Sequence, residues 1–218
     1  MHPPSSYHIH NFSDFLCEYF CWILSFNGAS RLLWLSFFWF ILEFITRVIA
    51  RKNGTPKTSY LAAQLKDNGS WWLITLSSLL IFGIIVLVLH VRWASDLPAS
   101  LIPLGIILML MGTALRIWAV ISLGKFFTME VVIFPNHHLI DKGPYQWLQH
   151  PSYSGVFITA IGLGLATGYV MVLIAFLIIL GFSLGYRIYV EEKALKERFG
   201  SEWVAYAKRT WRILPWIL

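Results

Sequence analysis

The side chains best suited to chemistry lie in two short stretches of this sequence, one within residues 123–153 and one that begins at Arg187. The first stretch holds carboxylate, imidazole and hydroxyl groups together with turn residues, namely Glu130, His137, His138, Asp141, Lys142, Gly143-Pro144-Tyr145 and His150-Pro151-Ser152-Tyr153. The second holds Arg187, Glu191 and Glu192. A carboxylate can bind an ammonium group, and an arginine can bind a carboxylate through two parallel hydrogen bonds. Both stretches are therefore candidate parts of one binding site.

The rest of the chain is poor in charge. Its 218 residues are 57% hydrophobic and 13% charged, and the mean hydropathy is +0.65. Soluble domains are about 45–50% apolar and about 25% charged, so this composition excludes a disordered chain and a fold whose whole surface is wetted. The formal net charge is +6, but the basic residues cluster between apolar runs instead of covering a face that could bind nucleic acid. The composition indicates an all-α integral membrane protein that binds no nucleic acid.

Long apolar runs divide the chain into membrane spans. A helix needs about 20 apolar residues to cross the hydrocarbon core. Residues 31–50, 71–91 and 98–122 each predict one span, and residues 154–186 form an apolar run too long for a single crossing. That run predicts a helical hairpin, which brings the total to about five transmembrane helices. Residues 11–27 are apolar but contain acidic groups, so we expect an interfacial helix there, with a sixth span as the alternative.

Glycines mark the ends of the remaining elements. Gly162, Gly164 and the sequence Ala166-Thr167-Gly168-Tyr169 predict the break in the hairpin. Residues 187–199 predict a charged tail helix that ends at Gly200, and Ser201 is expected to cap a second short helix. The chain is thus expected to comprise an N-terminal segment (1–30), three transmembrane helices (31–122) and a catalytic region with the loop, the hairpin and the tail (123–218).

The positions of Lys and Arg predict the orientation of these spans. They are concentrated in the 51–70 loop, the 123–153 loop and the tail, whereas the opposite side of the membrane would carry Arg31 and Arg92. Loops rich in Lys and Arg face the cytoplasm. The hairpin returns the chain to the side from which the 123–153 loop left, so both polar stretches are expected to meet at the cytoplasmic face.

Simpler interpretations of the polar residues are open at this point. Arg187 and Glu191 are four residues apart on one helix face and could form an intrahelical ion pair, and Glu192 is expected to pair with Lys196 in the same way. The two adjacent histidines of the first stretch could be loop residues without a partner. The usual helical spacings of metal ligands are absent, so no metal site is predicted.

Three motifs in order resemble the isoprenylcysteine carboxyl methyltransferase family. Residues 137–153 are similar to its H-x-L-V-x-x-G-x-Y…R-H-P-S-Y block. Residues 187–200 resemble its R-I-x-x-E-E-x-x-L-x-x-x-F-G motif, and residues 203–215 resemble its closing Y-x-x-Y-x-x-R…L-P. The resemblance covers residues 112–218, about half of the chain, and the order of the motifs around one apolar hairpin makes it specific. Gln149 departs from the pattern, because the family usually has arginine at that position.

The resemblance implies a methyltransferase with S-adenosylmethionine as methyl donor, bound in a cytoplasmic pocket between the loop and the tail helix. The positions that match the family's cofactor-binding residues are Glu130, His137, His138, Leu139, Ile140, Tyr145, His150, Pro151, Ser152, Tyr153 and Glu191. Arg187 matches the substrate-side arginine and is the candidate catalytic residue. The ammonium group of the donor suits a carboxylate such as Glu191, and an acceptor carboxylate suits arginine.

The expected reaction is methyl esterification of an isoprenylcysteine-like carboxylate, so the expected partners are a lipophilic or prenylated substrate and membrane lipids. Such a carboxylate is ionised at pH 7, and methyl transfer to it needs alignment and a dry site but no general base. Methylation of a phospholipid headgroup, or of another amine or thiol, is the alternative within the superfamily. A nicotinamide-dependent sterol-type reductase and a non-catalytic membrane scaffold are further alternatives.

Overall fold

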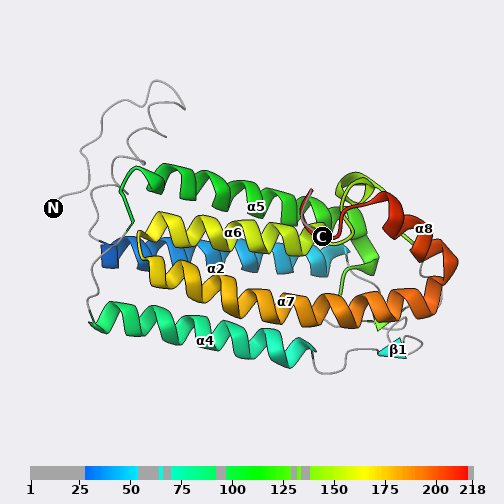
Figure 1. Cartoon of the computed structure of the whole chain (residues 1–218), viewed down its shortest axis with the longest axis horizontal. Coiled ribbons are helices and arrows are strands. Elements are labelled where there is room, and N and C mark those ends of the chain that lie inside the picture. The colour runs from blue at the N-terminus through cyan, green and yellow to red at the C-terminus, as the bar shows by residue number, and fades with distance from the viewer. Residues whose placement is uncertain are drawn as a thin grey trace, which may run out of the picture.

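The described part of the chain is almost entirely helical. The computed structural model describes residues 28–53, 64–65, 70–91, 97–128, 132–133 and 138–215. The α-helices are α2 (Gly28–Asn53), α4 (Ser70–Val91), α5 (Leu101–Leu123), α6 (Pro151–Thr167), α7 (Val170–Phe199) and α8 (Ser201–Arg209). The first five of these helices run alongside one another in a bundle, and α8 lies at one end of it (Figure 1). The predicted interfacial segment 11–27 lies outside the described residues.

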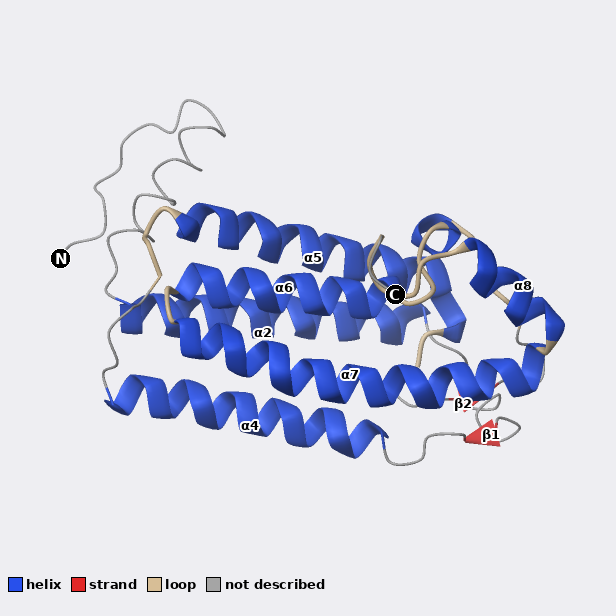
Figure 2. Cartoon of the chain, in the orientation of Figure 1, coloured by secondary structure: helices blue, strands red, loops and turns tan. Residues whose placement is uncertain are grey.

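Short elements connect the helices near α8. The 3-10 helices η1 (Gly124–Phe126) and η2 (Gly143–Gln146) follow α5 and precede α6. The strands β1 (Gln64–Leu65) and β2 (Val132–Ile133) form an antiparallel pair of two residues each (Figure 2). This small pair is the one departure, among the residues described, from the predicted all-α fold.

Two of the described helices are long and apolar enough to cross a membrane. These are α5, continued through η1, with a mean hydropathy of 2.1, and α7, with a mean hydropathy of 2.2. The helices α2 and α4 cover the first two predicted spans. Helix α6 has 17 residues, about 26 Å of helix. The apolar helices indicate an integral membrane protein, and the count of about five spans stays a prediction.

The predicted hairpin is present, but its second arm continues into the predicted tail helix. Helix α6 ends at Thr167, Gly168 has a left-handed conformation with φ of 81°, and α7 begins at Val170. The boundary predicted at Arg187 is wrong, because α7 continues through it to Phe199. No proline interrupts this part of the sequence, and the Glu, Lys, Ala and Leu residues near its end favour a helix.

Glycines bring the backbones of α5 and α6 into contact. A Cβ atom at Gly112 would lie 2.5 Å from the backbone nitrogen of Thr159, and one at Gly155 would lie 2.6 Å from the carbonyl oxygen of Gly112. The hydroxyls of Thr113 and Thr159 lie 3.5 Å apart between the two helices. Small residues at such contacts allow the close packing on which helix association within a membrane depends. This contact therefore fixes the position of α6, whose first turn carries several of the predicted site residues.

Two charged residues inside the bundle neutralise each other. Arg116 of α5 lies with two guanidinium nitrogens 3.0 Å from the two carboxylate oxygens of Glu43 in α2. The side chains are 14% and 18% exposed, and an unpaired charge at this depth would be costly. Nη1 of Arg116 also lies 3.5 Å from the hydroxyl of Ser152. The ion pair therefore joins α2 and α5 directly beside the first turn of α6.

The chain turns sharply between α7 and α8. Gly200 has φ of 53°, a conformation that glycine adopts readily, and α8 begins with the next residue. The predicted capping of α8 by Ser201 is wrong, because Gly200 occupies the N-cap position and no side chain caps the helix. Glycine is itself acceptable at an N-cap, so the turn needs no hydroxyl.

Candidate functional site

A cavity opens where η1, the segment before α6, the end of α7 and α8 meet. It contains about 850 Å³ of empty space, a volume that includes the part open to solvent. The residues that line it are Leu123, Phe126, Phe127, Thr128, His138, Leu139, Ile140, Tyr145, Gln149, His150, Ser152, Tyr153, Arg187, Glu191, Leu195, Phe199, Trp203 and Tyr206. The cavity is therefore built from the two sequence stretches that carry the polar groups.

Most of the predicted site residues line this cavity: His138, Leu139, Ile140, Tyr145, His150, Ser152, Tyr153, Arg187 and Glu191. Pro151 does not line it, and its ring is buried at the first position of α6, where the fixed φ of proline suits a helix start. Glu130 and His137 lie outside the described residues, so their positions stay predictions. The hairpin brings the loop and the later part of α7 together as the sequence predicted.

Arg187 and Glu191 are joined through a tyrosine of another helix. Nε of Arg187 donates a hydrogen bond to the hydroxyl of Tyr153 at 3.2 Å, and this hydroxyl donates to Oε2 of Glu191 at 2.7 Å. Arg187 is 3% exposed, so its permanent charge lies inside the protein. Spacing alone allowed an intrahelical ion pair between Arg187 and Glu191. In the structure, the hydroxyl of Tyr153 contacts both charged groups and holds them in a fixed relation.

Tyr206 of α8 holds the loop that forms one wall of the cavity. Its hydroxyl donates to the carbonyl oxygens of Tyr145 at 2.8 Å and Leu148 at 3.1 Å. Burial raises the pKa of Tyr145 and that of Tyr206 above the ordinary value. The charge of Glu191 raises the pKa of Tyr145 further, and the charge of Asp141 does the same for Tyr206. Both phenols are therefore neutral at physiological pH.

Residues 211–213, here called the C-terminal strap, pair with the segment before α6. The backbone N–H groups of Gln149 and His150 donate to strap carbonyls at 2.7 and 3.1 Å, and the strap donates back to the carbonyl of Trp147 at 2.8 Å. The hydroxyl of Ser154 donates to a third strap carbonyl. The end of the described chain therefore fixes the backbone from which His150 reaches the cavity.

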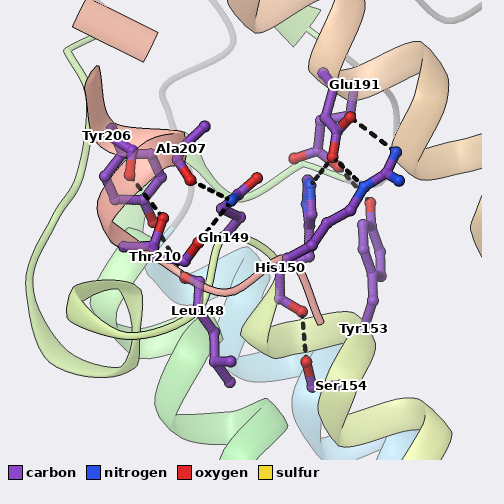
Figure 3. A network of polar contacts seen from close by, with 11 residues as sticks. Leu148, Gln149, His150, Tyr153, Ser154, Glu191, Tyr206, Ala207 and Thr210 are labelled. Carbon is purple, nitrogen blue, oxygen red and sulfur yellow. Dashed lines mark hydrogen bonds and ion pairs between the residues drawn. The ribbon is translucent and has the colours of Figure 1, made fainter. Parts of the chain in front are cut away.

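Gln149, where the family usually has arginine, caps the end of α8. Its Nε2 group donates to the carbonyl oxygens of Ala207 at 3.1 Å and Thr210 at 3.0 Å (Figure 3). The last carbonyls of a helix have no partner within the helix, so they need such a donor. Gln149 therefore lacks the positive charge that the family usually has here, and its neutral side chain joins α8 to the loop.

The carboxylate of Glu192 binds both His150 and the strap. Nε2 of His150 lies 3.1 Å from Oε1, and Arg212 donates from Nε at 2.7 Å and from Nη2 at 2.9 Å to the two carboxylate oxygens. This arrangement replaces the expected ion pair with Lys196. Burial alone would raise the pKa of Glu192, but hydrogen bonds from His150 and Arg212 outweigh it and lower the pKa. Because an ionised carboxylate can only accept, Nε2 of His150 carries the proton.

Aromatic rings that the sequence did not single out complete the cavity: Phe126, Phe127, Phe199, Trp203 and Tyr206. The rings of His150 and Tyr153 stack with centroids 5.7 Å apart, and the ring of Trp203 lies 6.5 Å from that of His150. Phe199, Trp203 and Tyr206 belong to the motifs that carry the family resemblance, so their motif positions were a usable signal. The Phe126-Phe127 pair had no such signal, because it belongs to none of the three motifs.

The cavity combines one carboxylate, one buried guanidinium and neutral hydroxyls with aromatic walls. In the part of the chain that the structure describes, no group of three or more His, Cys, Asp or Glu side chains is placed to hold a metal ion. The carboxylate suits a cationic group, the aromatic rings suit a planar one, and the guanidinium suits an anion. The cavity can therefore hold a cationic cofactor beside an anionic substrate.

This same region is similar to known proteins. Residues 105–197 match the model of the isoprenylcysteine carboxyl methyltransferase (ICMT) family. The chain is 34% identical over 115 residues to protein-S-isoprenylcysteine O-methyltransferase B of Arabidopsis thaliana, a match that covers 52% of this chain and 58% of that relative. It is 27% identical over 154 residues to the uncharacterized protein YpbQ of Bacillus subtilis, with 68% of this chain and 87% of that one covered. The match thus spans little more than half the length of the plant relative.

The fold is shared with a solved structure of the eukaryotic intramembrane Ras methyltransferase ICMT. The TM-score is 0.60, and the likeness covers 89% of this chain and 70% of that one at 20% sequence identity. At this identity the likeness concerns the fold. The family match includes α6, most of α5 and most of α7, which carry Ser152, Tyr153, Arg187 and Glu191. The region that carries the cavity, residues 105–197, is thus similar to the isoprenylcysteine carboxyl methyltransferase family in sequence, and the chain is similar to one solved ICMT structure in fold.

Proposed function

We propose that this protein transfers a methyl group from S-adenosylmethionine to the carboxylate of an isoprenylcysteine-like lipid. The observation that carries the proposal is the pairing of Glu191 and buried Arg187 in one cavity, bridged by Tyr153. One charged group suits a cationic methyl donor and the other an anionic acceptor. The named activity of the Arabidopsis relative supports the same reaction.

The donor set of the cavity fits S-adenosylmethionine. When bound, this cofactor supplies a methyl group on a sulfonium, ready for in-line displacement. Glu191 would hold the ammonium group, and the rings of Phe199 and Trp203 offer faces for the adenine. His138, Leu139, Ile140, Tyr145, His150, Ser152 and Tyr153 belong to the proposed binding set because they line the cavity. Glu130, His137 and Pro151 belong to it by motif position alone.

Arg187 is proposed to position the acceptor carboxylate. It lies 17 residues after Val170, about 26 Å along α7, close to the level at which a span of about 30 Å leaves the hydrocarbon. A lipid-borne carboxylate would meet its charge there without leaving the bilayer. Such a carboxylate is already ionised at pH 7 and needs no general base. The raised pKa values of Tyr145 and Tyr206 agree with this, because neither phenol is available as a phenolate base.

The buried arginine also favours a carboxylate acceptor over an amine. The ammonium group of a phospholipid headgroup would be repelled by Arg187, which is 3% exposed and always charged. Two like charges brought close together in a site of low dielectric repel each other strongly. Methylation of an amine headgroup is therefore the less favoured alternative.

We also propose that the chain crosses the membrane about five times with the cavity on the cytoplasmic side. The clustering of Lys and Arg supports this orientation. Single cysteines at Ala99 and Lys142, at opposite ends of the bundle, in a Cys17/Cys21-free background, are expected to be labelled from opposite sides of sealed vesicles. Labelling of both from the same side would overturn the orientation.

The reaction is tested by titration and product analysis. We expect detergent-solubilised protein to bind S-adenosylmethionine and not NADPH. With radiolabelled cofactor, a farnesylcysteine analogue is expected to gain a methyl group that alkali releases, because a methyl ester hydrolyses and an N-methyl group does not. Label in an aminophospholipid, or an alkali-stable product, would contradict the proposed acceptor.

A further inference from the structure

A groove on the outer side of α7 and α8 lies behind the candidate cavity. It is lined by Tyr189, Glu192, Lys193, Lys196, Trp203, Val204, Ala207 and Lys208, and we call it the lysine groove. Figure 1 shows the end of α7 and α8 meeting at this corner of the bundle. Trp203 lines both the groove and the cavity, so this buried ring separates them.

The positive charge of the lysine groove has no partner among the described residues. Lys193, Lys196 and Lys208 are exposed, and none of them is ion-paired or hydrogen-bonded to another described side chain. Glu192 is the acidic residue of the groove, but Arg212 binds both of its carboxylate oxygens. The three ammonium groups are therefore available to an external anion.

The length of α7 places these lysines at the depth of lipid headgroups. About 20 residues of helix cross the hydrocarbon core, which takes α7 from Val170 to Tyr189. Lys193 follows about 6 Å further along the helix and Lys196 about 10 Å further. The headgroup layer on each side of a bilayer is about 5–7 Å thick, and lysine side chains extend several ångströms further. An anion at this depth is most simply the headgroup of a membrane lipid.

An apolar stripe on α7 leads directly to the groove. Ile178, Phe182, Tyr186 and Tyr189 are 55%, 79%, 41% and 61% exposed and follow one another at spacings of three or four residues. Side chains at these spacings share one helix face, and Lys193 continues the series. Tyrosine is enriched at the membrane interface, as expected for the last two members. This face offers a continuous path for an acyl chain that ends at the lysines.

We infer that the lysine groove binds the headgroup of an anionic phospholipid whose acyl chain lies along this stripe of α7. The lysines supply the attraction, and the stripe supplies the apolar contact. The inference concerns the outer side of α7 and does not depend on methyl transfer in the cavity. An occupied groove would hold α8 against α7 directly behind Trp203.

The inference is tested by counting bound lipids with native mass spectrometry. Purified protein is mixed with phosphatidylglycerol and phosphatidylcholine of identical acyl chains, and the ratio of bound lipids is measured. We expect a clear preference for phosphatidylglycerol. Lys193→Gln should reduce this preference about fivefold, since a basic side chain near an anionic surface contributes about 1 kcal/mol. The triple variant K193Q/K196Q/K208Q should have no preference.

Lys142→Gln is the matched control, because it removes one exposed lysine from the loop before η2. This control should leave the preference unchanged, and circular dichroism should show native helix content in all variants. The inference is overturned if the wild type shows no preference, if the triple variant keeps it, or if Lys142→Gln lowers it as much as Lys193→Gln. Equal competition by free glycerol phosphate would assign the groove to a soluble anion, which also overturns it.

Discussion

Two contacts begin at adjacent residues of α7 but use their carboxylates differently. One is the cavity wall around Glu191, and the other is the contact of Glu192 with His150 and Arg212, here called the latch. Glu191 accepts from Tyr153 and faces the cavity. Glu192 accepts from His150 and Arg212 and holds the C-terminal strap. A rotation of about 100° between neighbouring helix residues is enough to separate the two roles. The carboxylate of Glu191 can therefore bind a ligand, while that of Glu192 is occupied by contacts that shape the site.

The largest effect is expected at the cavity wall. Arg187→Ala should lower methyl-transfer turnover about 100-fold, as expected for loss of a positioning group, while the affinity for S-adenosylmethionine changes less than about threefold. Arg187→Lys should also lose turnover, because lysine keeps the charge but lacks the planar fork. Initial rates and calorimetry on both variants provide the measurement.

Lys142→Ala is the control for Arg187, because Lys142 is exposed and does not line the cavity. It should keep nearly full turnover. A near-silent Arg187→Lys together with an Arg187→Ala variant that loses cofactor affinity and stability would mean that Arg187 serves only the hydrogen-bonded chain to Glu191.

The contact between α5 and α6 supports both regions, so its loss should lower the stability of the whole site. Gly112→Ala places a methyl group against the backbone of α6 and should destabilise the protein by about 1–3 kcal/mol. Gly181→Ala is the matched control, because nothing lies within 4 Å of a Cβ there and alanine favours a helix. Thermal unfolding should separate the two variants, and an equally stable Gly112→Ala would show that the close contact is not needed.

The latch should contribute less to the free energy of unfolding than the contact between α5 and α6. Its side chains are 24% exposed for Glu192 and 40% for Arg212, so we expect a coupling energy of about 1 kcal/mol from a double-mutant cycle of Glu192→Gln and Arg212→Gln. Chemical denaturation of the four proteins gives this coupling. A coupling of zero would mean that the backbone pairing of the strap holds the segment before α6 unaided.

The pH dependence of the latch has a definite sign. Its hydrogen bonds lower the pKa of Glu192 from the ordinary value of 4.5, so the folded state holds this proton less tightly than the unfolded state. The resulting stability is fully present above the unfolded pKa and is lost as the pH falls through the folded pKa. We expect stability to decrease below about pH 4.5 in the wild type, and by less in Glu192→Gln. Identical acid profiles would contradict the lowered pKa.

The parts predicted from the sequence are those set by local patterns. Apolar runs located the helices, Gly168 falls within the predicted break, and the spacing of Arg187 and Glu191 placed both on one face of α7. The motifs identified half of the residues that line the cavity, and these residues meet because the hairpin returns the chain to the side from which the loop left. The boundary predicted at Arg187 between the hairpin and the tail helix was wrong, since a change from apolar to charged residues marks the membrane boundary and not a helix end.

The contacts that were not predicted join residues far apart in the chain. Glu43 and Arg116 are charged residues within two predicted spans, and their pairing depends on how α2 packs against α5. The role of Gln149 as a cap for α8 and the pairing of Glu192 with Arg212 depend on the return of the C-terminal strap. No local sequence pattern indicates that the C-terminal strap returns to the segment before α6, so these contacts became evident only in the tertiary structure.

The most direct test compares cofactor affinity in the two neighbouring carboxylate variants. Calorimetric titration with S-adenosylmethionine should show that Glu191→Ala weakens binding by about 1.5–3 kcal/mol, the range for a charge-assisted hydrogen bond, while Glu192→Ala changes affinity less than about threefold. This result would confirm that Glu191 is the carboxylate that meets the cofactor. Equal losses in both variants, or no loss in Glu191→Ala, would contradict the proposed site.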